Sequence, residues 1–183
     1  MLTTEIEKFR KKIDSIDNDI LRLISKRKDY AVRIGSLKDE LRASSSEKKL
    51  GAYDSKRESE IIQKLTASSD GISECAIEAI FREIISFCRN SAHKTAICIL
   101  GDDWHYVEAA KAHFGRSCEF KTCSDMKGLM AALADSLFNI ALVPLTVSDV
   151  VLENLMKSGY IQNDTITIEL ENEMTKAYVF VHE

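Results

Sequence analysis

Six charged side chains in the first sixty residues have the types and spacings expected of a binding site for a small dianion: Arg10, Arg27, Lys38, Asp54, Arg57 and Glu58. Arg27 and Lys38 are eleven residues apart, close to three helical turns, so both face one side of a helix about 16 Å apart. Arg10 precedes Arg27 by seventeen residues, which turns it by about 100° onto another face. A symmetric dimer in which each site borrows an arginine from its partner would satisfy this arrangement.

The acidic residues form a second polar face of the predicted site. Asp54, Arg57 and Glu58 follow each other at i, i+3 and i+4, so they share one side of a second helix. Any one of these charges alone is typical of a solvated helix surface, so spacing by itself does not decide between a surface and a site.

Helical periodicity predicts the elements that carry these residues. Apolar residues at three- and four-residue steps predict one long amphipathic helix over about 4–41, followed by helices over about 54–66 and 73–90. The two later helices are too short to cover the apolar stripe of the first, which favours an intertwined dimer. The polar, Ser-rich linker 42–53 predicts a mobile loop over the site.

The sequence divides into two domains near Ala92. Residues 1–93 are helical in pattern and slightly basic, whereas residues 94–183 are acidic and alternate short β-rich runs with helical ones. The predicted strands are 95–100, 118–123, 139–145, 165–170 and 176–182, and the predicted helices are 106–114, 126–135 and 147–159. The predicted fold is an all-α N-terminal three-helix domain, an intertwined dimer, followed by a small α/β domain.

Composition argues against several classes of function. No apolar run reaches the length of a membrane span and the N-terminus lacks the apolar core of a signal peptide, so a cytoplasmic protein without membrane contact is expected. The five cysteines include no C-x-x-C pair and the four histidines are scattered, so neither a metal nor a disulfide framework is expected. The net charge is −4 and basic residues alternate with acidic ones, which disfavours nucleic-acid binding. No cofactor is expected.

Three stretches closely resemble the all-helical chorismate mutase family: "FRKKIDSIDNDILRLISKRKDYAVRIGSLK", "YDSKRESEIIQKL" and "AIFREIISFCRNS". The resemblance implies a homodimer that converts chorismate to prephenate in aromatic amino-acid biosynthesis. It implies that Arg27, together with Arg10 from the partner subunit, holds the two substrate carboxylates. Lys38 is then placed at the ether bond that breaks, so Arg10, Arg27 and Lys38 are the expected catalytic residues.

The remaining site residues follow from the same resemblance. Asp54 and Glu58 correspond to hydrogen-bonding partners of the substrate hydroxyl and of nearby backbone. Arg57 corresponds to a cation near the carboxylate end, or alternatively forms a structural i, i+3 pair with Asp54. Cys88 occupies a small-residue position that lines the site, and its packing in the core would explain it equally well.

One position departs from the family pattern. Ala92 stands where the family usually has Gln or Glu, the second hydrogen-bond donor to the ether oxygen. Loss of such a donor costs roughly 3 kcal/mol of transition-state stabilisation, so slow turnover is expected unless another group substitutes. Asn90 and His93 are the nearby candidates, and either would need local unwinding of the helix end.

Residues 94–183 resemble the first lobe of a prephenate dehydratase, the domain that follows chorismate mutase in bifunctional enzymes of phenylalanine synthesis. The dehydratase glycine-rich turn is replaced by Gly-Asp-Asp-Trp-His at 101–105, and its Pro-x-Glu-Asn-Ser motif by Pro-Leu-Thr-Val-Ser at 144–148. The sequence also stops before a second lobe. No dehydratase activity is therefore expected, and the lobe is expected to pack, oligomerise or modulate the mutase.

Two alternatives remain open from the sequence. The same cations would bind isochorismate in a lyase that forms salicylate and pyruvate, although a dehydratase-like lobe connects the chain with phenylalanine synthesis. A non-catalytic regulatory or partner-binding protein is the alternative from another class, because Ala92 and the altered lobe both depart from active enzymes.

Overall fold

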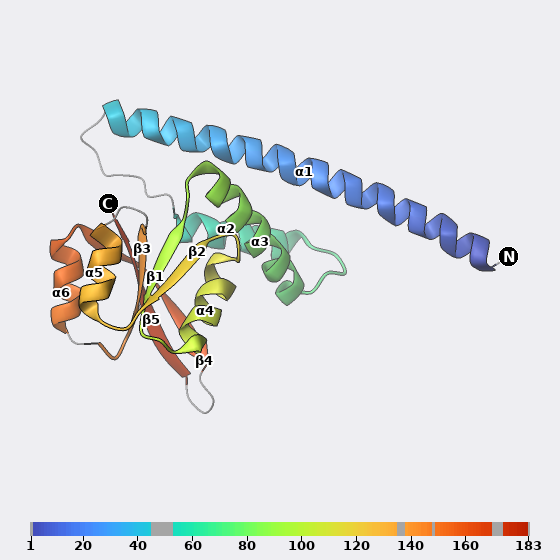
Figure 1. Ribbon diagram of the computed structural model, residues 1–183. Helices are drawn as coiled ribbons and strands as arrows, with labels where there is room; N and C mark the ends of the chain where they lie inside the picture. The colour runs from blue at the N-terminus through green and yellow to red at the C-terminus, as the bar shows by residue number, and fades with distance from the viewer. Residues whose placement is uncertain (1, 45–52, 135–137, 148, 170–173, 183) are drawn as a thin grey trace.

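The computed structural model describes residues 2–44, 53–134, 138–147, 149–169 and 174–182. Its N-terminal part consists of the helices α1 (Leu2–Ser44), α2 (Ser55–Ser68) and α3 (Glu74–Ala92) (Figure 1). The three predicted helices are confirmed, with ends within three residues of those expected. Of the predicted linker, residues 42–44 belong to α1, and residues 45–52 lie outside the described part of the chain.

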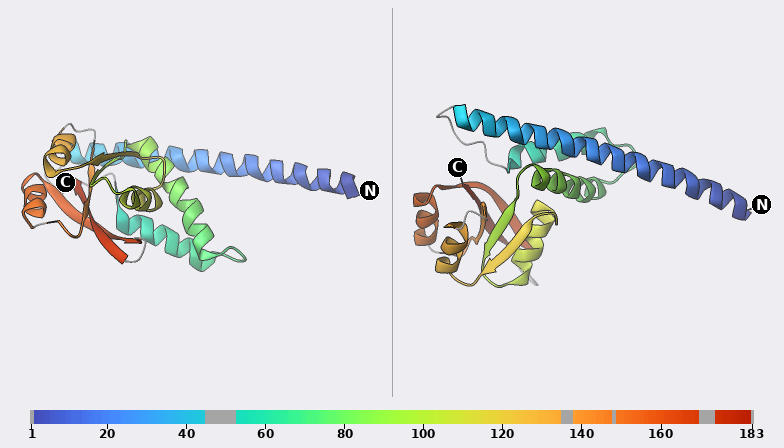
Figure 2. Two further views of the ribbon diagram at one scale, coloured as in Figure 1. Left: turned by 60° about the horizontal axis from the view of Figure 1, so that its bottom comes forward. Right: turned by 45° about the horizontal axis from the view of Figure 1, so that its top comes forward.

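The long helix α1 extends well beyond the rest of the molecule. Its 43 residues correspond to a length of about 64 Å, and its N-terminal half projects from the body in every view (Figures 1 and 2). The C-terminal half packs against α3. Only one part of α1 is therefore covered within a single chain.

Capping residues define where the two shorter helices begin. Asp54 precedes α2, and its side chain accepts a hydrogen bond from the backbone N–H of Arg57. Ser73 precedes α3 and accepts one from the backbone N–H of Ala76. Both caps satisfy N–H groups that a helix start otherwise leaves without a partner.

The second part of the chain is a five-stranded sheet with three helices, in agreement with the predicted α/β fold. The strands are β1 (Ala96–Leu100), β2 (Glu119–Cys123), β3 (Ile140–Pro144), β4 (Tyr160–Glu169) and β5 (Met174–His182). The helices are α4 (Trp104–Phe114), α5 (Met126–Ala134) and α6 (Asp149–Lys157). The strand order is β2-β1-β3-β5-β4, in which β1 is parallel to β2 and β3, and β5 is antiparallel to β3 and β4.

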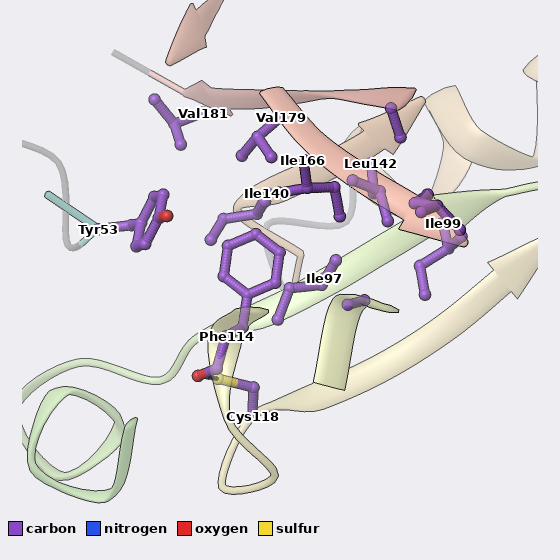
Figure 3. Close-up of a cluster of buried hydrophobic side chains, with 13 residues drawn as sticks. Tyr53, Ile97, Ile99, Phe114, Cys118, Ile140, Leu142, Ile166, Val179 and Val181 are labelled. Atoms are coloured by element: carbon purple, nitrogen blue, oxygen red, sulfur yellow. Dashed lines mark hydrogen bonds between the residues drawn. The ribbon is translucent and has the colours of Figure 1, made fainter. Parts of the chain in front are cut away.

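The sheet has a buried core on each face, because successive residues of a strand point to opposite sides. In β1, Ile97 and Ile99 join the core under α4, whereas Cys98 and Leu100 join the core under α5 and α6. Figure 3 shows the first of these cores, in which Phe114 packs between the strands and Tyr53, a residue of the N-terminal part. The two parts of the chain thus share one hydrophobic core.

Strand β4 begins five residues earlier than predicted. The sequence around Asn163 and Asp164 is poor in strand-forming residues, so only 165–170 had been predicted as a strand. In the structure this stretch pairs with β5, and a register shift between Gln162 and Asp164 accommodates the irregular residues. Tertiary pairing therefore outweighs local propensity here.

Candidate functional site

A pocket of about 170 Å³ lies where α1, the start of α2 and the end of α3 come together. Its lining comprises Arg27, Ala31, Ile34, Gly35, Lys38, Asp54, Arg57, Glu58, Ile61, Ile85, Cys88, Arg89, Ala92 and His93. Charged side chains contribute from all three helices, and aliphatic side chains lie among them. The pocket therefore combines a mainly apolar surface with several charged groups, as small-molecule sites commonly do.

Six of the seven residues predicted for the site lie in this lining. Arg27 and Lys38 both face it from α1, as the three-turn spacing had predicted, and both are half-buried. The acidic-basic face at the start of α2 supplies three more, and Cys88 of α3, which is buried, is the sixth. That these residues bind a ligand remains a prediction.

Arg10 is absent from the lining. It is exposed on the projecting half of α1, where its guanidinium contacts Glu7 at 2.7 Å. Seventeen residues of helix separate it from Arg27, a distance of about 25 Å along the axis. Within one chain, Arg10 cannot reach this pocket.

The start of α2 is ordered by its own backbone and side chains. Asp54 Oδ1 accepts from the Arg57 N–H at 2.9 Å, and the Asp54 carbonyl accepts from the Glu58 N–H at 3.0 Å. The guanidinium of Arg57 contacts Glu60 at 3.4 Å, so the alternative in which it pairs with Asp54 is wrong. Arg57 contacts Asp54 only through its main chain, and its exposed side chain extends at the pocket rim.

Glu58 and Arg89 form a buried ion pair in the pocket wall. Glu58 is 6% and Arg89 8% exposed, and Arg89 Nη1 donates to Glu58 Oε1. Burial is the largest single effect and would lower the pKa of Arg89, but the charges of Glu58 and Cys118 and the hydrogen bonds to both together outweigh it, so the pKa lies above its usual value. The second carboxylate oxygen, Glu58 Oε2, is buried and has no hydrogen-bond partner among the described residues. This carboxylate is fixed at one oxygen and has its other oxygen unpaired.

Arg89 was missed by the sequence reasoning, although a signal was present. It lies four residues after Ile85 and directly after Cys88, on the apolar face of α3. A cation on the buried face of a helix requires a buried anion or carbonyl partner, so this position could have been singled out.

Residues 9–93 match the family described as chorismate mutase type II. The match covers the helical part of the chain. A bifunctional chorismate mutase/prephenate dehydratase of Aquifex aeolicus (strain VF5) is 30% identical over 147 residues, 77% of this chain and 39% of that relative. The enzyme of the same description from Neisseria gonorrhoeae (strain ATCC 700825 / FA 1090) is 30% identical over 117 residues, 62% of this chain and 30% of the relative. The chain thus spans less than two fifths of the length of these two relatives.

A likeness among solved structures is much weaker. The chain described as "GqqA- a novel type of quorum quenching acylases" is 16% identical, with a TM-score of 0.40 over 48% of this chain and 47% of that one. This likeness is too low to assign a fold.

In the segment that matches this family, α3 ends at the position that departs from the family pattern. Ala92 is the last helical residue, and His93 has an extended backbone with φ −144° and ψ 130°. The side chain of Asn90 accepts a hydrogen bond from the Thr95 N–H at 2.8 Å and so holds this turn. Of the two candidates for the missing donor, His93 lines the pocket, whereas Asn90 caps the exit from the helix.

His93 lies against α1 at a point where a side chain larger than that of glycine would have to displace it. A Cβ on Gly35 would lie 2.9 Å from His93 Nε2 and 3.2 Å from the Ala92 Cβ, so the missing side chain allows α1 and α3 to approach. His93 Nε2 is buried without a hydrogen-bond partner among the described residues and lies 3.7 Å from Asp39 Oδ2. The imidazole is thus wedged between the two helices at the end of the pocket.

The segment before α2 is attached to the α/β lobe. The hydroxyl of Tyr53, which is 4% exposed, lies 2.6 Å from Nε2 of His113 and donates to Asp164 Oδ2 at 3.4 Å. Hydrogen bonding to His113 is the main cause that lowers the pKa of Asp164, and burial is the main cause that raises the pKa of Tyr53. This polar cluster joins the segment before α2 to α4 and β4.

The described residues were also compared with the requirements of a metal site and of a membrane span. Across the described residues, no group of three or more His, Cys, Asp or Glu side chains is arranged to hold a metal ion. In the same part of the chain, no helix combines the length and the apolar character needed to cross a bilayer.

Proposed function

We propose that residues 9–93 rearrange chorismate to prephenate and that the active form is a dimer. The observation that carries the proposal is the meeting of Arg27, Lys38 and Glu58 in one pocket, within a chain segment of the chorismate mutase type II family. Relatives described as bifunctional chorismate mutase/prephenate dehydratases support the same substrate.

The proposed chemistry needs charge and shape rather than a nucleophile. The rearrangement is pericyclic and has no obligatory proton transfer, so the enzyme accelerates it by restraining the substrate and stabilising charge. Guanidinium groups bind carboxylates through two parallel hydrogen bonds, which suits Arg27 to hold one end of the folded substrate. Negative charge grows on the ether oxygen as its bond breaks. An ammonium at Lys38 therefore binds the transition state more tightly than the substrate.

Glu58 is proposed to bind the hydroxyl of the substrate ring. Its Oε2 atom is buried, has no hydrogen-bond partner in the described part of the chain and belongs to a residue of the pocket lining. A hydroxyl donor would satisfy this oxygen, whose burial without a partner is costly. Asp54 provides a second carboxylate at the same helix start and is proposed to contact the same part of the ligand.

A second copy of the chain is proposed to complete each site. The half of α1 that projects from the body exposes one apolar row, with about half of each side chain accessible: Ile6, Phe9, Ile13, Ile16, Ile20 and Leu23. A row of this length on a helix without cover in its own chain fits helix-to-helix association. Arg10 lies on the same projecting half. In an antiparallel dimer it would reach the pocket of the partner chain, whereas it cannot reach the pocket of its own chain.

The α/β lobe is proposed to have no dehydratase activity. After β1, where a dehydratase-like lobe would have its glycine-rich turn, Asp103 accepts from the His105 N–H at 2.9 Å and caps α4. The His105 side chain contacts the same carboxylate oxygen at 2.7 Å. These polar groups are used for the local structure of the helix start.

The test is an assay of the purified protein with chorismate and, separately, with isochorismate, with products identified by chromatography. Prephenate from chorismate, lost in Lys38→Ala and kept in Lys64→Ala, supports the proposal, because Lys64 is an exposed lysine of α2 outside the pocket. Formation of salicylate and pyruvate from isochorismate would show lyase activity in place of the proposed mutase activity. Turnover of neither substrate would favour a regulatory or binding role, and phenylpyruvate would show dehydratase activity in the lobe.

A further inference from the structure

Arg89 joins the pocket wall to the α/β lobe through a single side chain. Its Nη1 donates to Glu58 Oε1, and its Nη2 donates to the carbonyl oxygen of Phe114 at 2.6 Å and to Cys118 Sγ at 3.4 Å. Glu58 belongs to α2, whereas Phe114 is the last residue of α4 and Cys118 follows it. The guanidinium therefore bridges the helical part and the lobe inside the protein.

The lobe side of this bridge is rigid and electrostatically suited to a cation. Phe114 is fully buried in the core under the sheet, and Cys118 belongs to the same cluster (Figure 3). The last carbonyls of a helix have no partner within the helix and carry its partial negative charge, so Phe114 O is a favourable acceptor for Arg89. The core of the lobe thus fixes one end of the guanidinium.

The two parts are also in tight van der Waals contact beside this bridge. Gly115 caps α4 with φ 78°, and a Cβ at this position would lie 2.3 Å from the Cβ of Ser86 on α3. The close approach of α3 to the end of α4 therefore depends on the absence of a side chain. This contact keeps Phe114 O within reach of Arg89.

We propose that Arg89 is a positioning residue of the chorismate pocket and that the α/β lobe, by holding Arg89, sets the orientation of Glu58 toward the substrate. This inference rests on the proposed mutase function and adds a role for the lobe to it. Tyr53, which the lobe holds through His113, fixes the chain just before Asp54 at the other end of the same helix turn. Both ends of the turn that carries the pocket carboxylates are thereby attached to the lobe.

The kinetic consequence follows from the role of Glu58. The ring hydroxyl is not part of the bonds that change, so its contact with Glu58 is made equally in the bound substrate and in the transition state. Loss of such uniform binding raises KM and leaves kcat almost unchanged. A displaced Arg89 is expected to produce the same pattern, in contrast to Lys38→Ala, which lowers kcat.

The first test pushes the lobe away without touching the pocket. Gly115→Ala places a methyl group against Ser86, whereas Gly101→Ala, also at positive φ (107°), meets nothing within 4 Å. The two variants share the backbone strain of alanine in this region, so only the steric wedge distinguishes them. We expect Gly115→Ala to raise the KM for chorismate by about tenfold or more with kcat within about threefold of wild type, and Gly101→Ala to leave both unchanged.

The second test acts on the bridge itself and carries the proposal if the wedge variant does not fold. Arg89→Lys keeps the charge but has one ammonium in place of a planar fork, so it cannot hold Glu58 and Phe114 O together. Its KM for chorismate is expected to rise by about tenfold, and that of Glu58→Gln is expected to rise by a similar factor. The KM of the double variant is expected to be no higher than that of the poorer single variant. Thermal unfolding sets an assay temperature at which every variant is folded.

The outcomes separate this inference from the proposed function. Two results would overturn the positioning role if the wild type turns chorismate over: an unchanged KM in folded Arg89→Lys, or the same KM and kcat for Gly115→Ala and Gly101→Ala. Either result would leave the proposed mutase activity unaffected. A fall in kcat without a rise in KM would likewise overturn the positioning role, because Glu58 is then not the group displaced. Absence of turnover by the wild type would overturn both.

Discussion

The hydroxyl of Tyr53 lies 2.6 Å from Nε2 of His113, and this contact ties the residue before α2 to the α/β lobe. The tyrosine packs edge-on against Phe114 with ring centroids 5.1 Å apart, so it belongs to the core of the lobe although it is part of the helical segment by sequence. Figure 3 shows this arrangement, with Tyr53 beside Phe114 under the strands. The positions of the pocket carboxylates thus depend on packing that is remote in sequence.

Tyr53→Phe should change how stability depends on alkaline pH. Burial, and secondarily the charges of Glu58 and Asp164, raises the pKa of Tyr53 above its usual value of about 10. The folded state therefore keeps the proton while the unfolded state releases it, so this contribution is complete below pH 10 and is lost as pH rises further. Above pH 10 the free energy of unfolding of wild type should fall by about 1.4 kcal/mol per pH unit more than that of the variant.

Near pH 8, Tyr53→Phe should instead be less stable by about 1–3 kcal/mol, because His113 loses a buried partner. Urea unfolding at pH 8 and pH 11 measures both effects, with Tyr30→Phe on the exposed surface of α1 as the control for removal of a tyrosine. A stability difference between wild type and Tyr53→Phe that stays constant from pH 8 to pH 11 would contradict the prediction.

Ala92→Gln should raise kcat for chorismate. The position lines the pocket at the end of α3, and a glutamine there would supply the second donor to the ether oxygen that the resemblance to the family implies. A single donor of this kind changes kcat by about 100-fold or more when removed elsewhere, so an increase of up to about 100-fold is expected. Ala92→Met adds similar bulk without a donor and is the matched control. Equal rates for the two variants would show that no donor is missing.

Gly35→Ala should stabilise the protein only when His93 is also reduced in size. Alanine is favoured over glycine inside a helix by about 1 kcal/mol, but its Cβ would lie 2.9 Å from His93 Nε2. In the wild-type background the two effects should largely cancel. In a His93→Ala background the gain of about 1 kcal/mol should appear.

Chemical unfolding of the four variants in this cycle measures the coupling between Gly35 and His93. An equal effect of Gly35→Ala in both backgrounds would mean that His93 moves aside without cost. In that case the wedged imidazole would not control the approach of α1 to α3.

Parts of the fold and site were predictable because they depend on local sequence pattern. The helices α1, α2 and α3 follow from apolar periodicity, and the shared face of Arg27 and Lys38 follows from helix geometry alone. The helix pattern could have marked Arg89 as a buried cation, but its partners were not predictable in this way, because one of them is a carbonyl that lies twenty-five residues further along the chain. The early start of β4 likewise depends on its pairing with β5.

The role of the lobe could not be derived from sequence for the same reason. The contacts that attach it to the pocket wall are a side chain to a main-chain oxygen, Arg89 to Phe114, and a hydroxyl to an imidazole, Tyr53 to His113. Neither pair has a spacing rule comparable to the i, i+4 pattern of a helix. Such contacts become visible only when the packing of α4 against the helical part is known.

The shared site predicts that two inactive variants restore activity when mixed. Arg10→Ala removes the cation that each chain is proposed to lend, and Lys38→Ala removes one that it keeps, so either homodimer should have no intact site. In a mixed dimer one pocket has both defects and the other has none. Random reassociation makes half of the dimers mixed, so about a quarter of the wild-type sites should be recovered.

The experiment compares the chorismate turnover of separately purified Arg10→Ala and Lys38→Ala proteins with that of the two after unfolding and joint refolding. Arg27→Ala mixed with Lys38→Ala is the control, because both residues line the same pocket from one chain and their mixed dimer has no intact site. Recovery of about a quarter of wild-type activity in the first mixture and none in the second would support the borrowed arginine. If neither mixture recovers activity although both proteins refold as dimers, Arg10 does not act across the interface. The exposed apolar row of α1 would then bring two chains together without completing the pocket.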